Sequence, residues 1–187
     1  LLPAKRNDKG EIIKKSPLGF FIAGEAKLQD DARPSSIGSY KIKEDVLADL
    51  ENNPLRPGLN GTGTIRNSEF VTADDFEKFK ARQNVAEQSY KLNAKIDFQP
   101  TDNITLTLGG NASYEKRHDY VYEYSLFNPS NNPEITDLQY NAFVRFKHRI
   151  KTDSVKWLSN LYYQVQADYM WAKTTTWDDS HKDNIFN

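Results

Sequence analysis

The chain has 187 residues, with 25 basic and 26 acidic side chains and a formal net charge of −1, so no field of one sign favours a nucleic-acid partner. It contains no cysteine, which excludes disulfides, thiolate zinc sites and cysteine nucleophiles. The mean hydropathy is −0.77, and the longest apolar run, about residues 18–24, is far shorter than the ~20 residues of a membrane helix. A helical membrane protein is therefore excluded, whereas a membrane β-barrel is not, because each of its strands is only half apolar.

Residues 1–15 do not have the architecture of a signal peptide, because no apolar segment follows their charged side chains. A barrel of the outer membrane needs such a signal. We therefore expect this chain to be an internal piece of a longer protein.

Five segments show alternating apolar and polar side chains. A period of two places alternate side chains on opposite faces of a β-strand. We therefore expect strands at about residues 18–29, 90–98, 104–126, 137–151 and 158–176. The third strand is extended to residue 126 because Tyr120, Tyr122 and Tyr124 stand, like Tyr114, at even-numbered positions, and would therefore share its face of the strand (the same parity).

The clearest alternation predicts a hairpin at residues 89–114, with a turn at Pro100–Asn103. Its apolar positions are Tyr90, Leu92, Ala94, Ile96 and Phe98, followed by Ile104, Leu106, Leu108, Ala112 and Tyr114. The intervening positions are mainly polar. Aromatic residues stand at the margins of the apolar face, which is typical of a strand with lipid on one side and water on the other.

The connection at residues 31–88 is very long and is expected to carry structure of its own. We predict one helix at Glu44–Glu51 and another at Thr72–Asn84. Thr72 would be the N-cap of the second helix, with Asp75 as its capping-box partner.

Short and long connections alternate along the chain. Pro100–Asn103 and Thr152–Lys156 are short, residues 31–88 are very long, and Asn128–Thr136 is intermediate. Membrane barrels sort their connections in this way, with short periplasmic turns and long outer loops. At ~3.3 Å per residue and a tilt of ~40°, Tyr90–Phe98 would rise about 20 Å, near the ~25 Å height of the lipid-facing band.

Five strands are too few to close a membrane barrel, which in a single chain begins at about eight strands. An open edge in lipid would leave backbone groups unsatisfied, at several kcal/mol each. We therefore expect an all-β fold in which residues 1–187 form a single partial domain, a segment of a transmembrane antiparallel β-barrel. Residues 31–88 would be an extracellular loop with short helices.

Candidate metal ligands do not converge. His118, His148 and His181 lie in different segments, whereas a metal site needs ligands that meet. We expect His118 and His181 to be solvated strand-end or loop residues, and His148 to lie at a membrane interface. The acidic tip at residues 178–183 lacks the ordered oxygen spacing of a calcium loop, so we expect no metal there.

A basic set with the parity of the polar face comprises Lys91, Lys95, Arg145, Lys147 and Arg149. One interpretation is a barrel lumen that attracts an anionic ligand. The other is pairing of these cations with Asp97, Asp168 or the carboxylates of a plug. Phe21, Phe143 and Tyr162 share this parity and are expected to pack on a plug.

No catalytic arrangement is found in the sequence. Without cysteine, a nucleophile would be a serine or threonine beside a histidine, and no serine lies in a strand–turn–helix elbow. Gly61–Gly63 lacks the lysine of a phosphate loop and is interpreted as a turn. We therefore expect neither an enzyme nor a cofactor.

With these residues in view, residues 16–179 resemble part of the β-barrel of a SusC-like TonB-dependent receptor of the Bacteroidetes outer membrane. Pro17–Glu25 resembles an early barrel strand after the plug, and the predicted Thr72–Asn84 helix leads into Gln88–Phe98. Pro100–Asn111 is similar to a periplasmic turn and the strand that follows it. The plug domain and the TonB-interacting segment are not in this chain.

The resemblance implies a plugged barrel of about twenty-two strands in the cell outer membrane, which takes up a nutrient ligand with energy from the periplasmic TonB complex. The implied partners are outer-membrane lipid, the plug, the remaining strands and a SusD-like surface lipoprotein. Loops carry specificity in such scaffolds, so we expect residues 31–88 to contact ligand or partner. Two alternatives stay open: another outer-membrane barrel for secretion, assembly or passive diffusion, and a soluble lipocalin-like binding sheet.

Overall fold

The computed structural model of the protein describes residues 5–6, 12–14, 17–151, 160–178, 181–182 and 184. Contacts between residues divide it into two compact units. The first unit comprises the described residues of Leu1–Lys27, Ser89–Glu115 and Asp137–Thr174, and the second those of Leu28–Gln88, Lys116–Thr136 and Thr175–Asn187.

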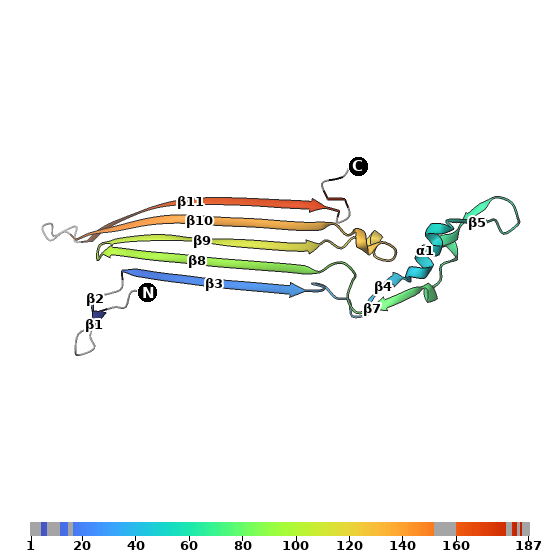
Figure 1. Ribbon diagram of the computed structural model, residues 1–187, viewed down its shortest axis with the longest axis horizontal. Helices are drawn as coiled ribbons and strands as arrows, with labels where there is room; N and C mark the ends of the chain where they lie inside the picture. Colours follow the sequence, from blue (N-terminus) through green and yellow to red (C-terminus); the bar gives the residue numbers. More distant parts are fainter. Residues whose placement is uncertain are drawn as a thin grey trace. The chain divides into compact units, whose positions relative to one another are not determined.

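The main element of the first unit is an antiparallel sheet of five long strands, drawn side by side in Figure 1. The strands are β3 (Leu18–Gln29), β8 (Glu87–Thr101), β9 (Ile104–His118), β10 (Glu134–Lys151) and β11 (Asn160–Trp177). Their order in the sheet is β11-β10-β9-β8-β3. The five strands expected from the alternation are thus confirmed. A separate two-stranded sheet pairs β1 (Lys5–Arg6) with β2 (Ile12–Lys14).

The expected extension of the third strand to Leu126 is wrong, because β9 ends at His118. The Asp119 N–H still donates to the Pro133 carbonyl at 3.0 Å, and the chain leaves the sheet after this bond. The 3-10 helices η3 (Tyr122–Tyr124) and η4 (Pro129–Asn131) follow. The intermediate connection is therefore residues 119–133 rather than Asn128–Thr136.

The β8–β9 turn is tighter than expected. Pro100 lies inside β8, and only Asp102 and Asn103 separate the two strands. The predicted short connection at Thr152–Lys156 lies outside the described residues.

The second unit contains several short elements. They are β4 (Ser39–Ile42), α1 (Glu44–Asn52), β5 (Leu55–Pro57), β6 (Thr64–Arg66), η1 (Asn67–Phe70), η2 (Ala73–Asp75) and β7 (Phe76–Phe79). The helix predicted at Glu44–Glu51 is confirmed by α1. Gly61 and Gly63 have φ of 71° and 73° in the turn between β5 and β6, as glycine permits.

The predicted helix at Thr72–Asn84 is wrong, although its capping box is present. The Thr72 N–H and hydroxyl both donate to the Asp75 carboxylate, at 2.7 and 3.0 Å. The helical turn stops after η2, and β7 pairs antiparallel with β4, with Phe76 opposite Ile42. Pairing with a distant strand therefore outweighs the local helix signal.

The buried hydrophobic residues among those described are Ile42, Val85 and Ile135, and all three belong to the second unit. The Phe76 and Phe127 rings meet edge to face, with centroids 5.9 Å apart. The first unit thus has no buried apolar core among its described residues.

Candidate functional site

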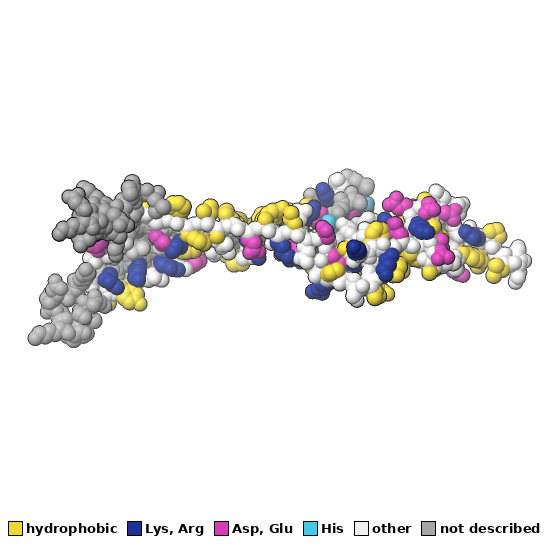
Figure 2. Space-filling model, turned by 90° about the horizontal axis from the view of Figure 1, so that it is seen from below, with side chains coloured by type: hydrophobic (Ala, Val, Ile, Leu, Met, Phe, Trp, Pro, Cys, Tyr) yellow, Lys and Arg dark blue, Asp and Glu magenta, His cyan; other side chains and the backbone are white. Residues whose placement is uncertain are grey.

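One face of the five-stranded sheet is apolar and open. Its larger side chains are Phe20 and Ile22 of β3, Leu92, Ile96 and Phe98 of β8, Leu106 and Leu108 of β9, Tyr140, Val144 and Ile150 of β10, and Leu161, Tyr163 and Val165 of β11. Ile22 is 64% exposed, Leu108 55% and Val165 62%. Figure 2, which views the sheet along its edge, shows hydrophobic side chains lined up on one side. A contiguous apolar face of this kind marks an interaction surface.

Aromatic contacts mark one end of this face. The Tyr90 and Tyr114 rings stack with centroids 6.3 Å apart. Tyr140 lies 6.0 Å from Tyr169 and 5.2 Å from Trp171. Cross-strand aromatic pairs of this kind stabilise a sheet face.

A second aromatic cluster lies nearer the other end of the face. His148 packs edge-on against Tyr163, with centroids 5.4 Å apart, and the same pair shares a 3.2 Å hydrogen bond. Phe146 lies 6.1 Å from Tyr163. His148 therefore lies on the apolar face among aromatic side chains, as its even-numbered position in the alternation predicts.

The opposite face of the sheet is polar and charged. Lys91 pairs with Glu25 of the neighbouring strand at 3.4 Å, and Lys95 pairs with Asp97 at 2.8 Å. The Thr107 hydroxyl donates to Asp97 at 2.7 Å. The predicted pairing of the basic set with Asp97 is therefore confirmed for Lys95.

Arg145 reaches Asp168 indirectly. Its Nε donates to the Gln166 amide oxygen at 2.7 Å, and the Gln166 amide nitrogen donates to both Asp168 oxygens. The guanidinium also lies 5.4 Å from the centre of the Phe143 ring. Lys91, Lys95 and Arg145 are thus engaged within the sheet, which favours a structural role for Arg145.

A polar pocket in the second unit lies beside the ion pair between Arg82, which lines the pocket, and Asp31, which is the second residue after β3. The Asp31 side chain is only 2% exposed and pairs with the Arg82 guanidinium at 2.6 Å. Its carboxylate also accepts the backbone N–H groups of Arg33 and Arg82, at 2.8 and 2.9 Å. These hydrogen bonds lower the pKa of Asp31 to about 2, with the Arg82 side chain as the largest cause.

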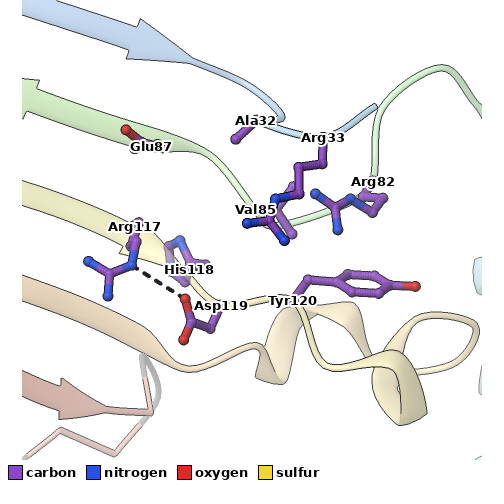
Figure 3. Close-up of a pocket in the computed structure, with 9 residues that line it drawn as sticks. All are labelled: Ala32, Arg33, Arg82, Val85, Glu87, Arg117, His118, Asp119 and Tyr120. Carbon is purple, nitrogen blue, oxygen red and sulfur yellow. Dashed lines mark hydrogen bonds and ion pairs between the residues drawn. The ribbon is translucent and has the colours of Figure 1, made fainter. Parts of the chain in front are cut away.

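The pocket has a volume of about 410 Å³, within the range of small-molecule sites. Figure 3 shows its lining, which is Ala32, Arg33, Arg82, Val85, Glu87, Arg117, His118, Asp119 and Tyr120. The Arg82 guanidinium lies 4.6 Å from the centre of the Tyr120 ring. Arg117 pairs with Asp119 at 3.4 Å, and this pair is partly exposed.

His118 ends β9, as expected of a strand-end residue, but it is not solvated. Its side chain is 12% exposed, and its Nε2 lies 3.8 Å from the buried Glu134 carboxylate. His181 is exposed, as predicted, and its Nδ1 lies 2.9 Å from Asp178. Among the residues that the structure describes, no three histidine, aspartate or glutamate side chains gather where they could hold a metal ion. Residues 179 and 183 of the acidic tip lie outside them.

The alternation did not reveal this pocket, because Asp31 and Arg82 are 51 residues apart in sequence. The one sequence signal is that both lie at the ends of the long connection 31–88. None of the described helices is long and apolar enough to cross a membrane. Comparison of the chain with family models, curated proteins and solved structures finds no match.

Proposed function

We propose that this chain is a segment of an outer-membrane β-barrel whose apolar sheet face contacts lipid. The observation that carries the proposal is the contrast between the two faces of one sheet. Exposed side chains such as Ile22, Leu108 and Val165 cover one face, and the Lys95–Asp97 and Arg145–Gln166 contacts lie on the other. Lipid on one side and water on the other accounts for both.

Exposure of this apolar face to water would cost free energy. Each fully buried side chain of valine, leucine or phenylalanine is worth roughly 1.5–3 kcal/mol relative to an exposed one. Described residues bury none of the large apolar side chains on this face. A lipocalin-like sheet would instead turn such a face inward over a ligand.

Within this class, we propose a TonB-dependent receptor that takes up a nutrient ligand across the cell outer membrane. The proposal draws on the resemblance at Pro17–Glu25 and Pro100–Asn111 and on the sorting of the connections. The two-residue turn after β8 contrasts with the long connection 31–88, which contains one α-helix, two 3-10 helices and four short strands. The partners would be lipid, a plug, further strands, the TonB complex and a surface lipoprotein.

Site-directed spin labelling tests the lipid contact directly. This chain has no cysteine. Single cysteines at Leu92, Asn93, Ala94, Lys95 and Ile96 of the full-length protein in membranes, with any cysteine outside this chain replaced by serine, each carry one label. Oxygen concentrates in lipid and a nickel chelate in water. We expect oxygen accessibility to peak at Leu92, Ala94 and Ile96, and nickel accessibility at Asn93 and Lys95.

Protection of Leu92, Ala94 and Ile96 from both reagents, in a protein that purifies without detergent, would instead establish a soluble binding sheet. The lipid contact would also be overturned if oxygen accessibility and nickel accessibility peaked at the same residues. N-terminal sequencing of the native protein then separates the two barrel classes. A plug sequence ahead of this chain supports the receptor, and its absence supports a barrel for secretion, assembly or diffusion.

A further inference from the structure

We infer that Asn60 is a site of spontaneous deamidation, which converts its side-chain amide into a carboxylate in the loop between β5 and β6. Asn60–Gly61 is the only asparagine–glycine pair in the sequence. Both residues are exposed, and Figure 1 draws their loop beyond the end of β5. The preceding Leu59 is 87% exposed, so water reaches this part of the loop.

The reaction needs a backbone nitrogen, a side-chain amide and water. The Gly61 nitrogen attacks Cγ of Asn60, so that a bond forms between N and Cγ while the bond between Cγ and Nδ2 breaks. Nδ2 leaves as ammonia and takes up the proton of the Gly61 N–H, and a five-membered succinimide ring remains. Water then opens the ring at one of its two carbonyl groups, which gives aspartate or isoaspartate.

Glycine after the asparagine removes the main steric obstacle to this ring. A side chain on the following residue would crowd the approach of its nitrogen to Cγ. Apart from its chain neighbours, no described residue lies within 4 Å of a Cβ added at Gly61. The φ of Gly61 is 71°, a conformation that favours glycine, so the turn itself requires the residue that permits the reaction.

One hydrogen bond opposes the reaction. The Gly61 N–H donates to the Gly58 carbonyl at 2.9 Å, and the peptide group between Asn60 and Gly61 must turn away from this carbonyl to reach Cγ. The net contribution of such a bond is modest, so we expect the fold to slow the reaction only about tenfold. The other bond of the turn, from the Gly58 N–H to the Gly63 carbonyl at 2.9 Å, is not part of this movement.

The structure protects the next candidate in the sequence. Asn67 precedes Ser68, which is also small, but Asn67 is only 1% exposed and its Nδ2 donates to Asp49 at 3.1 Å. Asn53 precedes Pro54, which has no backbone N–H to lose. Burial and the identity of the following residue therefore single out Asn60.

Each modified chain gains a negative charge in this loop. Isoaspartate also adds one carbon to the backbone of a turn that the hydrogen bond from Gly58 to Gly63 closes. This modification goes beyond the proposed lipid contact, and either can fail without the other.

Peptide mapping by mass spectrometry tests the site in the full-length protein, incubated in mildly alkaline buffer. We expect Asn60 to deamidate faster than any other asparagine of residues 1–187, at about one tenth of its rate in a synthetic peptide of residues 55–66. The rate should fall in mildly acidic buffer, because the attacking nitrogen must lose its proton.

Gly61→Ala and Gly63→Ala form a matched pair, because both glycines have positive φ in the same loop. Both substitutions strain the turn, but only Gly61→Ala places a methyl group beside the attacking nitrogen. Asn60 should therefore deamidate more slowly in Gly61→Ala than in Gly63→Ala, and circular dichroism checks that both variants fold. The inference is overturned if the two variants react at the same rate, if Asn60 stays intact while the peptide is fully converted, or if another asparagine of this chain reacts first.

Discussion

The Asp31 carboxylate accepts hydrogen bonds from both the side chain and the backbone of Arg82. Arg82 Nη2 lies 2.6 Å and Nε 3.2 Å from Oδ1, and the Arg82 backbone N–H donates to Oδ2 at 2.9 Å. This contact ties the segment after β3 to the segment before β8. It closes the long connection 31–88 at its base.

Asp31→Asn should destabilise the second unit. The substitution removes the negative charge while leaving the Arg82 guanidinium mostly buried, and breaking a buried pair typically costs about 3 kcal/mol or more. We expect a loss of about 3 kcal/mol in the free energy of unfolding, measured by urea denaturation of the full-length protein. Asp30→Asn, at the adjacent exposed position, is the control and should change little. A loss below about 0.5 kcal/mol would contradict this role of Asp31.

The same contact predicts a pH dependence. The pKa of Asp31 is about 2 in the folded chain and 3.8 as its ordinary value, so the folded state favours the ionised carboxylate. The stabilisation, about 2 kcal/mol, is fully present above about pH 5 and is lost as the pH falls toward 2. Unfolding of the wild type and Asp31→Asn should therefore differ most near pH 6 and converge near pH 2. A constant difference across this range would contradict the assigned pKa.

Gly110→Ala should disrupt the contact between β9 and β10. An added Cβ at Gly110 would lie 2.3 Å from the Asn141 carbonyl oxygen, so one of the two strands must shift. Overpacking of this kind costs about 1–3 kcal/mol. The matched control is Gly19→Ala in β3, where nothing lies within 4 Å of an added Cβ. Denaturation of both variants measures the difference, and equal stability would show that the sheet absorbs the methyl group.

Removal of residues 44–63 should spare the sheet and abolish partner contact. The deleted segment contains α1, β5 and the β5–β6 turn, and all five long strands lie outside it. We expect the spin-label pattern of β8 to persist, while chemical cross-links from this region to a surface partner are lost. A deletion of Asn60–Gly63 alone controls for the turn. Undiminished cross-linking in the longer deletion would place the partner elsewhere.

The alternation of side chains was sufficient to predict the five long strands and their two faces. This signal is local. In a strand, successive side chains point to opposite faces, so the position of a residue in the alternation gives its face without any knowledge of the neighbouring strands. The helix α1 was also predictable from its own segment of the sequence. The residues that carry the proposed lipid contact, such as Leu92 and Leu108, were therefore identified before any pairing was known.

Tertiary pairing decided what local signals could not. The Thr72–Asp75 capping box predicted a helix, but β7 instead pairs with β4, with Phe76 opposite the fully buried Ile42. Likewise, the parity of Tyr120 suggested a longer β9, whereas the chain turns at Asp119.

The pocket depended wholly on the three-dimensional structure. Asp31 and Arg82 are 51 residues apart, and neither stands out in its own segment. Contacts between distant segments form only when the chain between them folds, so a local pattern carries no information about them. The sequence alone determined a two-faced sheet, and the tertiary structure joined Asp31 to Arg82 beside one cavity.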